Sequence, residues 1–163
     1  MTSRDLLTQK LDLLRRLWKA HRKTLTEDQE LKHLLISHQR AFEKAQKVMK
    51  ETGGEAFCAR CGREKRSCCG EDMEFHCDDR LLLANLLCGV ELPSQRIFEN
   101  GCYFLGKEGC LLRIRPLICR NFICPELAAF LGTKKIALIQ HSLEEEARAL
   151  FFLEERISCL LAK

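Results

Sequence analysis

Ten of the eleven cysteines in this chain of 163 residues lie between Cys58 and Cys124. A hydrophobic core does not require so many thiols, so this segment either binds metal or is closed by disulfides, and the redox compartment decides between the two. Glycines break the segment into turns, as wrapping around a metal requires. The cysteines are arranged as Cys58-x2-Cys61-x6-Cys68-Cys69, then Cys77 and Cys88, then Cys102-x7-Cys110-x8-Cys119-x4-Cys124.

The first ten residues carry no secretory signal pattern. Arg4, Asp5 and Lys10 stand around only two leucines, and no apolar stretch of about 7–15 residues follows them. No apolar run reaches the length of a transmembrane helix, about 20 residues. We therefore expect a cytoplasmic chain without a membrane segment, in which the thiols are kept reduced. Metal binding is then favoured over disulfides, and the odd number of cysteines agrees with that choice.

The apolar pattern predicts one mainly α-helical domain over residues 1–163. Residues 1–54 are expected to form a helical hairpin, because apolar residues recur every three or four positions. Thr26 followed by Gln29 is a capping pattern that predicts the start of the second helix. Gly53 and the glycine after it are expected to end that helix, since glycine adopts the left-handed conformation without steric cost.

We expect residues 126–163 to form a long helix with a break at Gly132. Within the cysteine-rich segment, residues 55–125, a short helix is expected over Asp79–Leu87, and another is expected to begin at Pro116. The N-terminal hairpin and the C-terminal helix are expected to pack around this irregular segment as a bundle. Their apolar faces are also compatible with a protein partner.

The cysteine spacing fits metal but does not choose the metal. Cys58-x2-Cys61 lets two sulfurs from one turn reach the same ion, and both tetrahedral zinc and a [4Fe–4S] cluster take four thiolates. Adjacent Cys68 and Cys69 point apart in an extended chain, so we expect one of them to serve a second site, to bridge, or to pack. One or two sites are therefore possible. Cys77 beside His76 is an alternative ligand pair.

Arginines surround the last cysteines of the segment. Pro116 is expected to place Cys119 in the first turn of a helix, where the dipole and nearby Arg115 and Arg120 favour the thiolate. Four thiolates around zinc or an oxidised cluster carry a net negative charge, which Arg113, Arg115 and Arg120 are expected to offset. Cys88 and Cys159 are expected to be small buried hydrophobic residues.

The cysteine-rich segment resembles a known family. Cys58-x2-Cys61 with the Cys68-Cys69 pair, Gly101-Cys102-Tyr103-Phe104-Leu105, and Arg115-Pro116-x2-Cys119-Arg120-x-Phe122-x-Cys124 are similar to the bacterial and archaeal cysteine-cluster family of zinc- or iron-chelating proteins. A similar cluster occurs in flagellin lysine methylases, where it is associated with an iron–sulfur centre. The resemblance implies that eight cysteines are metal ligands: Cys58, Cys61, Cys68, Cys69, Cys102, Cys110, Cys119 and Cys124.

The first functional hypothesis is a metal-binding protein that holds a [4Fe–4S] cluster or zinc as an accessory, electron-transfer or structural module. One alternative is a modification enzyme of the methyl-transfer type, although no glycine-rich cofactor loop and no catalytic constellation stands out. Another is a zinc-dependent nucleic-acid binder, which the net charge of +4 and the few aromatic residues disfavour. A thiol-redox sensor built on Cys68 and Cys69 is the last alternative.

Overall fold

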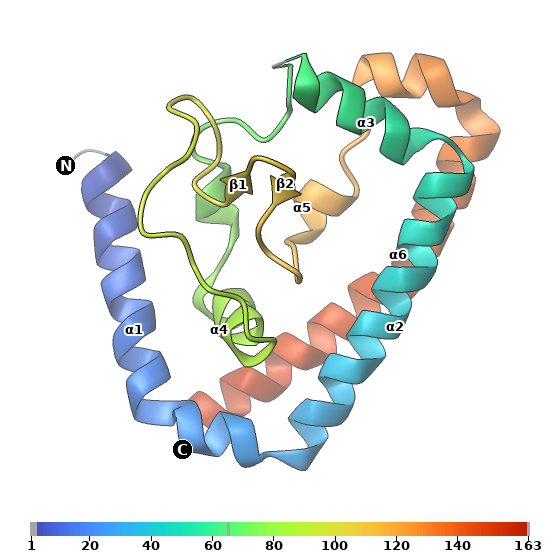
Figure 1. Ribbon diagram of the computed structural model, residues 1–163. Coiled ribbons are helices and arrows are strands. Elements are labelled where there is room, and N and C mark those ends of the chain that lie inside the picture. The colour runs from blue at the N-terminus through green and yellow to red at the C-terminus, as the bar shows by residue number, and fades with distance from the viewer. Residues whose placement is uncertain (1–2, 65, 163) are drawn as a thin grey trace.

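The computed structural model describes residues 3–64 and 66–162, and within them the chain is mainly helical, as predicted. A long helix ends the chain and two long helices begin it (Figure 1). Among the described residues, no helix is long and apolar enough to cross a membrane. The elements are α1 (Ser3–Glu27), α2 (Gln29–Glu51), α3 (Gly54–Arg63), the 3-10 helix η1 (Met73–His76), α4 (Asp79–Leu87), β1 (Leu105–Gly106), β2 (Gly109–Cys110), α5 (Leu117–Arg120) and α6 (Pro125–Leu161).

Asp28 forms the junction between α1 and α2. Its carboxylate accepts a hydrogen bond from the Leu31 backbone N–H at 2.7 Å, which caps α2, and it forms an ion pair with Arg156 of α6. The cap of the second helix is therefore Asp28, two residues after the predicted Thr26, which remains in α1. From this junction the two helices diverge: α2 packs along α6, whereas α1 contacts α4 and α6 (Figure 1).

The α2–α6 pair is the longest packed unit of the molecule. On α2, Ala41 and Ala45 are buried, and these small side chains allow the two backbones to approach closely. Leu143 and Leu153 of α6 are buried as well. Gly132 has φ 72° and ψ 163°, so the predicted break in the C-terminal helix is confirmed and α6 consists of two helical parts.

The short helix α3 is a feature that the sequence did not predict. Gly53, with φ 85°, ends α2 as expected, but a new helix begins at the next residue. The Phe57 ring of α3 packs against the Phe130 ring of α6, with ring centroids 5.1 Å apart. Cys58 and Cys61 therefore lie one helical turn apart rather than in an irregular loop.

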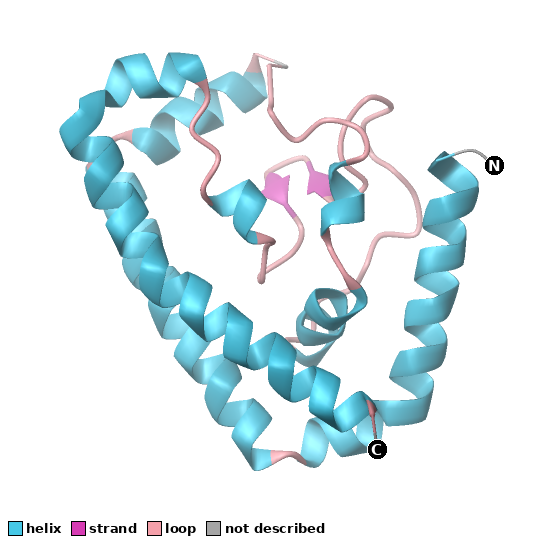
Figure 2. Cartoon of the chain, turned by 180° about the vertical axis from the view of Figure 1, so that it is seen from behind, coloured by secondary structure: helices cyan, strands magenta, loops and turns pink. Residues whose placement is uncertain are grey.

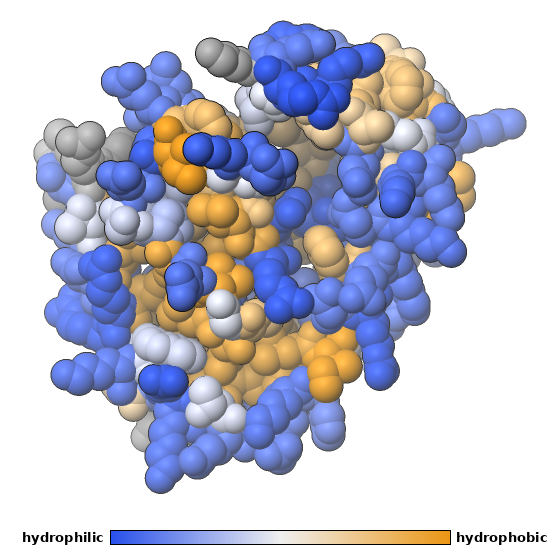
Figure 3. Space-filling model, in the orientation of Figure 1, coloured by the Kyte–Doolittle hydropathy of each residue, from blue (hydrophilic) through white to orange (hydrophobic). Residues whose placement is uncertain are grey.

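The rest of the cysteine-rich segment lies between the helical arms (Figures 1 and 2). The helix α4 has the predicted bounds, and Asp78 caps it by accepting from the Leu81 N–H at 2.9 Å. All residues from Leu81 to Asn85 are buried, so α4 is the centre on which the surrounding loops pack. On the face of the molecule seen in Figure 1, apolar residues gather in the middle and hydrophilic side chains lie at the margins (Figure 3).

Candidate metal centre

Backbone pairing holds together two segments of the site, one around Cys69 and one around Cys102. The Cys102 N–H donates to the Cys69 carbonyl oxygen at 2.9 Å, and Gly70 forms a β-bridge with Gly101. Residues 33 positions apart in the chain are thereby placed side by side. Buried Glu74 reinforces this contact, because its carboxylate accepts from the Tyr103 N–H at 3.2 Å.

A two-strand hairpin then returns the chain toward Cys102. The strand β1 pairs antiparallel with β2, which sets Leu105 opposite Cys110. The Leu105 N–H also donates to the Cys102 carbonyl oxygen at 2.9 Å. Gly109 has φ 119°, a backbone conformation that residues with a side chain rarely adopt, so glycine is needed at this turn. The hairpin places Cys110 near Cys102.

Buried Asn85 of α4 holds the next stretch of chain. Its side-chain oxygen accepts from the Arg113 and Ile114 N–H groups at 2.9 and 3.1 Å, and its amide donates to the Ile114 carbonyl oxygen at 2.8 Å. This clamp fixes the backbone shortly before Cys119. The helix predicted to begin at Pro116 is the single turn α5, and Pro116 is its N-cap residue.

Cys124 brings the end of the segment to α3. It caps α6, and its Sγ accepts a hydrogen bond from the Leu127 N–H at 3.4 Å. The pKa of the Cys58 thiol is raised first by burial and then by nearby thiolate charges, of which that of Cys124 is the largest, followed by Cys61 and Cys69. Cys58 is therefore an electrostatic neighbour of Cys124.

Cys69 is the electrostatic neighbour of more predicted ligands than any other thiol is. A hydrogen bond with the Cys68 thiol lowers the pKa of Cys69, and that of Cys68 is raised by the same bond. Ser67 and Arg115 lower the pKa of Cys69 further, so Cys69 is the thiol of this pair that ionises first. Its charge in turn raises the pKa of other predicted ligands, Cys58, Cys102, Cys110 and Cys119.

Burial opposes ionisation at Cys102 and Cys119. It raises the pKa of Cys102 to about 12 and that of Cys119, together with neighbouring thiolates, to about 11. The prediction that the helix dipole and the arginines favour the Cys119 thiolate is therefore wrong, because burial outweighs them. Arg115 acts in the opposite direction, because its positive charge lowers the pKa of Cys69, Cys110 and Cys119. The guanidinium of Arg115 is thus near enough to the thiols to compensate negative charge there.

Arg120 has a different environment from Arg115. Its guanidinium donates to both carboxylate oxygens of Glu146 on α6, at 2.7 and 2.9 Å, and to Gln46 on α2 at 3.1 Å. It also lies over the Phe42 ring, 4.6 Å from the centroid. These contacts hold α5, and with it Cys119, against the α2–α6 pair. Compensation of thiolate charge by Arg120 stays a prediction.

Cys77 also lies among the thiols of the predicted ligands. Its side chain is buried, and its pKa is raised by burial and then by the charges of three thiols: Cys102, Cys119 and Cys110. The sequence signal was the His76-Cys77 pair, but the adjacent thiols come from residues distant in the chain. Cys88 has Arg113, rather than a thiol, as its charged neighbour. The prediction that Cys159 is buried is wrong, because Cys159 lies on the exposed side of α6.

All eleven cysteines are free thiols. Within residues 3–64 and 66–162, no three side chains among His, Cys, Asp and Glu are already arranged to hold a metal ion. The donor chemistry nevertheless fits a thiophilic metal, because soft thiolates are the ligands that zinc and iron–sulfur clusters take from proteins. Metal-ligating thiols must lose their protons, and metal binding commonly completes the folding of such segments.

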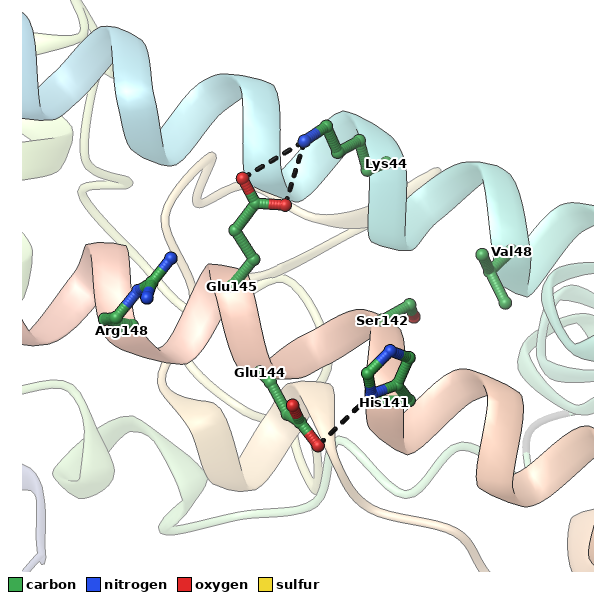
Figure 4. Close-up of a pocket in the computed structure, with 7 residues that line it drawn as sticks. All are labelled: Lys44, Val48, His141, Ser142, Glu144, Glu145 and Arg148. Atoms are coloured by element: carbon green, nitrogen blue, oxygen red, sulfur yellow. Dashed lines mark hydrogen bonds and ion pairs between the residues drawn. The ribbon is translucent and has the colours of Figure 1, made fainter.

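A second feature of the surface is a groove of about 490 Å³ between α2 and α6. Figure 4 shows its side chains paired with one another: Lys44 with Glu145 at 2.9 Å, and His141 with Glu144 at 3.4 Å. The Lys44–Glu145 contact is an exposed ion pair, and the His141–Glu144 contact is exposed as well. Their mutual pairing gives the groove no feature that points to a ligand.

Comparison of the chain with protein-family models, with curated proteins and with solved structures finds no match.

Proposed function

We propose that the chain is a metal-binding protein in which the cysteine-rich segment holds zinc or a [4Fe–4S] cluster, as an accessory, electron-transfer or structural module. The observation that carries the proposal is the convergence of thiols from four separate stretches of chain around Cys69. Its charged neighbours are predicted ligands from α3, from the pair with Cys68, from the β-hairpin region and from α5.

The large number of thiols in the segment is better explained by metal binding than by packing of the core. A core that needed only small apolar side chains would not gather groups whose ionised forms repel one another. Bringing several thiols together is favourable when a cation neutralises them, and Arg115 supplies further positive charge beside three of them. Metal binding must displace the protons that burial holds on Cys102 and Cys119, so affinity is expected to rise with pH.

The direct test is to purify the protein without oxygen and to measure iron, zinc and sulfide together with the absorption spectrum. A broad band in the visible range with iron and sulfide in equal amounts would identify a cluster. A colourless protein with stoichiometric zinc would identify a structural site. Protein that holds neither metal, and takes up neither after anaerobic reconstitution, would contradict the proposal.

Single Cys→Ser variants of the eight predicted ligands sort ligands from bystanders. Cys159→Ser is the matched control, because Cys159 is exposed on α6 and lies 35 positions after the last predicted ligand. Loss of metal in the ligand variants with full retention in the control is the expected result. The methyl-transfer, nucleic-acid-binding and thiol-redox alternatives and the protein partner stay predictions.

A further inference from the structure

The net positive charge of the chain comes from the outer side of α1, which forms one edge of the molecule (Figures 1 and 2). Hydrophilic side chains line this edge in Figure 3. The other residues hold 22 of the 27 Lys and Arg side chains and all 23 Asp and Glu side chains, a net charge of −1. Between Leu13 and Lys23 the helix has no carboxylate and five exposed cations: Arg15, Arg16, Lys19, Arg22 and Lys23.

Most of these cations have no anionic partner of their own. Arg15 forms an exposed ion pair with Asp12 at 2.6 Å. Among the described residues, no carboxylate forms an ion pair with Arg16, Lys19 or Lys23. These three lie three and four positions apart, a spacing at which like charges on a helix repel one another. An anionic surface placed over this side of α1 would relieve that repulsion.

A second stripe of apolar side chains runs beside the cations. Leu6 and Leu13 are 40% and 42% exposed, and because they are seven residues apart they lie on one side of the helix. Half-buried Leu17 and exposed Ala20 continue the stripe at spacings of four and three. Half-buried Lys10 occupies the position between the two exposed leucines. This alternation of three and four is the pattern by which one helix packs along another.

The two flanks of this stripe differ. Leu7 and Leu14, on one flank, are buried in the core of the molecule. On the other flank, Arg16 follows Leu13 by three residues and Lys23 follows by a further seven. In paired helices, side chains at these flanking positions form the ion pairs that set the choice of partner. The open flank of the stripe therefore selects a helix that carries carboxylates.

A protein helix fits this surface better than a membrane or a nucleic acid does. A helix that lies in a membrane surface inserts its broad apolar face, and on α1 that face is buried in the protein. A phosphate backbone is recognised through charge and gives exposed leucines nothing to pack against. Single strands stack on aromatic rings, and the aromatic residue of α1, Trp18, is half-buried.

We propose that the outer side of α1 is a docking surface for an acidic amphipathic helix of a partner protein. Apolar side chains of that helix pack on Leu6, Leu13 and Leu17, and its carboxylates pair with Arg16 and Lys23. The inference is independent of the proposed function, because α1 contains no cysteine.

The test compares two fluorescein-labelled synthetic peptides by the fluorescence anisotropy that each shows with the purified protein. The leucine peptide is an acidic helix about three heptads long, with Leu at the packing positions and Glu beside them. The glutamine peptide has the same charge, with Gln in place of each Leu. Wild-type protein is expected to bind the leucine peptide at least about tenfold more tightly, because only that peptide buries apolar surface.

Two variants change the docking surface. Arg16→Glu/Lys23→Glu should weaken binding of the leucine peptide at least about tenfold, because like charges then meet across the interface. Leu13→Gln should weaken it about fivefold through the loss of apolar contact. Lys32→Glu/Lys50→Glu is the matched control, since it makes the same change in charge at exposed positions of α2 and should bind as the wild type does. Circular dichroism should show native helix content in all variants.

Three results would overturn the inference. The first is equal affinity of the wild type for the two peptides, and the second is unchanged binding of the leucine peptide by Arg16→Glu/Lys23→Glu. The third is tighter binding of a DNA duplex or of phosphatidylserine vesicles than of the leucine peptide, which would assign the cations to a nucleic acid or to a membrane. None of these results concerns bound metal, so each leaves the proposed function intact.

Discussion

The α2–α6 pair and the cysteine-rich segment are held together in different ways. Regular apolar stripes bury one helix against the other, with Ala45 and Ile139 completely inaccessible to solvent. The cysteine-rich segment contains only short elements, and its loops are fixed by buried polar side chains such as Asn85 and Glu74. The contrast indicates that the helical pair supplies a stable frame, whereas the order of the segment depends on a few polar clamps and, as we propose, on metal.

The largest expected effect is at the contact between the two regions. Glu146→Ala would leave the guanidinium of Arg120 buried without its anion, because the two side chains are only 6% and 1% exposed. Removing one partner of a buried ion pair costs about 3–5 kcal/mol. Urea unfolding measures the change in the free energy of unfolding.

Glu145→Ala is the neighbouring control for Glu146→Ala. Glu145 pairs with Lys44 at the surface, so its loss should cost less than about 1 kcal/mol. Equal effects of the two variants would show that the Arg120 contact does not join the segment to the frame.

Inside the segment, Asn85→Ala should destabilise the protein by about 3 kcal/mol. The change leaves the buried Ile114 N–H without its partner and releases the Arg113 N–H, and each unsatisfied buried group costs about 1–3 kcal/mol. Hydrogen exchange should show the loss of protection at these two amides. Asn100→Ala, at an exposed position, is the control. Unchanged protection in Asn85→Ala would show that the clamp is not what orders the loop.

Within the frame, Gly132→Ala tests the break in α6. A side chain at φ 72° and ψ 163° is strained, although the added methyl meets no neighbour, so we expect a loss of about 1–2 kcal/mol. Gly62→Ala in α3 also meets no neighbour but has ordinary helical backbone, and it should stabilise the protein by about 0.5–1 kcal/mol. Thermal unfolding distinguishes the two. A neutral Gly132→Ala would mean that the break does not require glycine.

The smallest expected effect is a dependence of the stability of the α2–α6 pair on pH. Burial lowers the pKa of His38 on α2 below its usual 6.5, an effect that Glu146 opposes and Arg120 reinforces. Since the unfolded chain takes up this proton at higher pH than the folded chain, stability should be complete above pH 6.5 and fall as the pH decreases through the folded pKa.

His38→Leu should reduce the slope of stability against pH between about 7 and 5 in metal-free, reduced protein. His33→Leu, at an exposed position on the same helix, controls for the loss of a histidine. An unchanged slope in His38→Leu would assign the pH dependence to other groups.

Local signals in the sequence predicted much of the fold. The α4 bounds follow from the Asp78 cap and the glycine after the helix, and the break in α6 follows from Gly132. Features that depend on long-range contacts could not be predicted in this way. The helix α3 is held by the packing of Phe57 on Phe130, and the divergence of α1 from α2 depends on the separate contacts of each helix with α4 and α6.

The candidate site shows the same limit. The Cys-x2-Cys spacing alone identified Cys58 and Cys61 as a pair, and the helix α3, which the sequence did not predict, places them one helical turn apart. Cys77 acquires its thiol neighbours only when the β-hairpin and α5 fold over η1. The contact of Arg120 with Glu146 depends likewise on the packing of α5 against α6, and no local pattern around Arg120 indicates it.

Native mass spectrometry of protein purified without oxygen is the most direct test of metal binding by the cysteine-rich segment. The mass of the folded chain is compared with the mass of the same sample after denaturation in acid, which removes metal. If the segment binds metal, the folded mass will exceed the denatured mass by bound zinc or by an iron–sulfur cluster, and the excess will be smaller in the Cys58→Ser variant. Equal masses before and after denaturation, with all thiols reduced, would contradict the account.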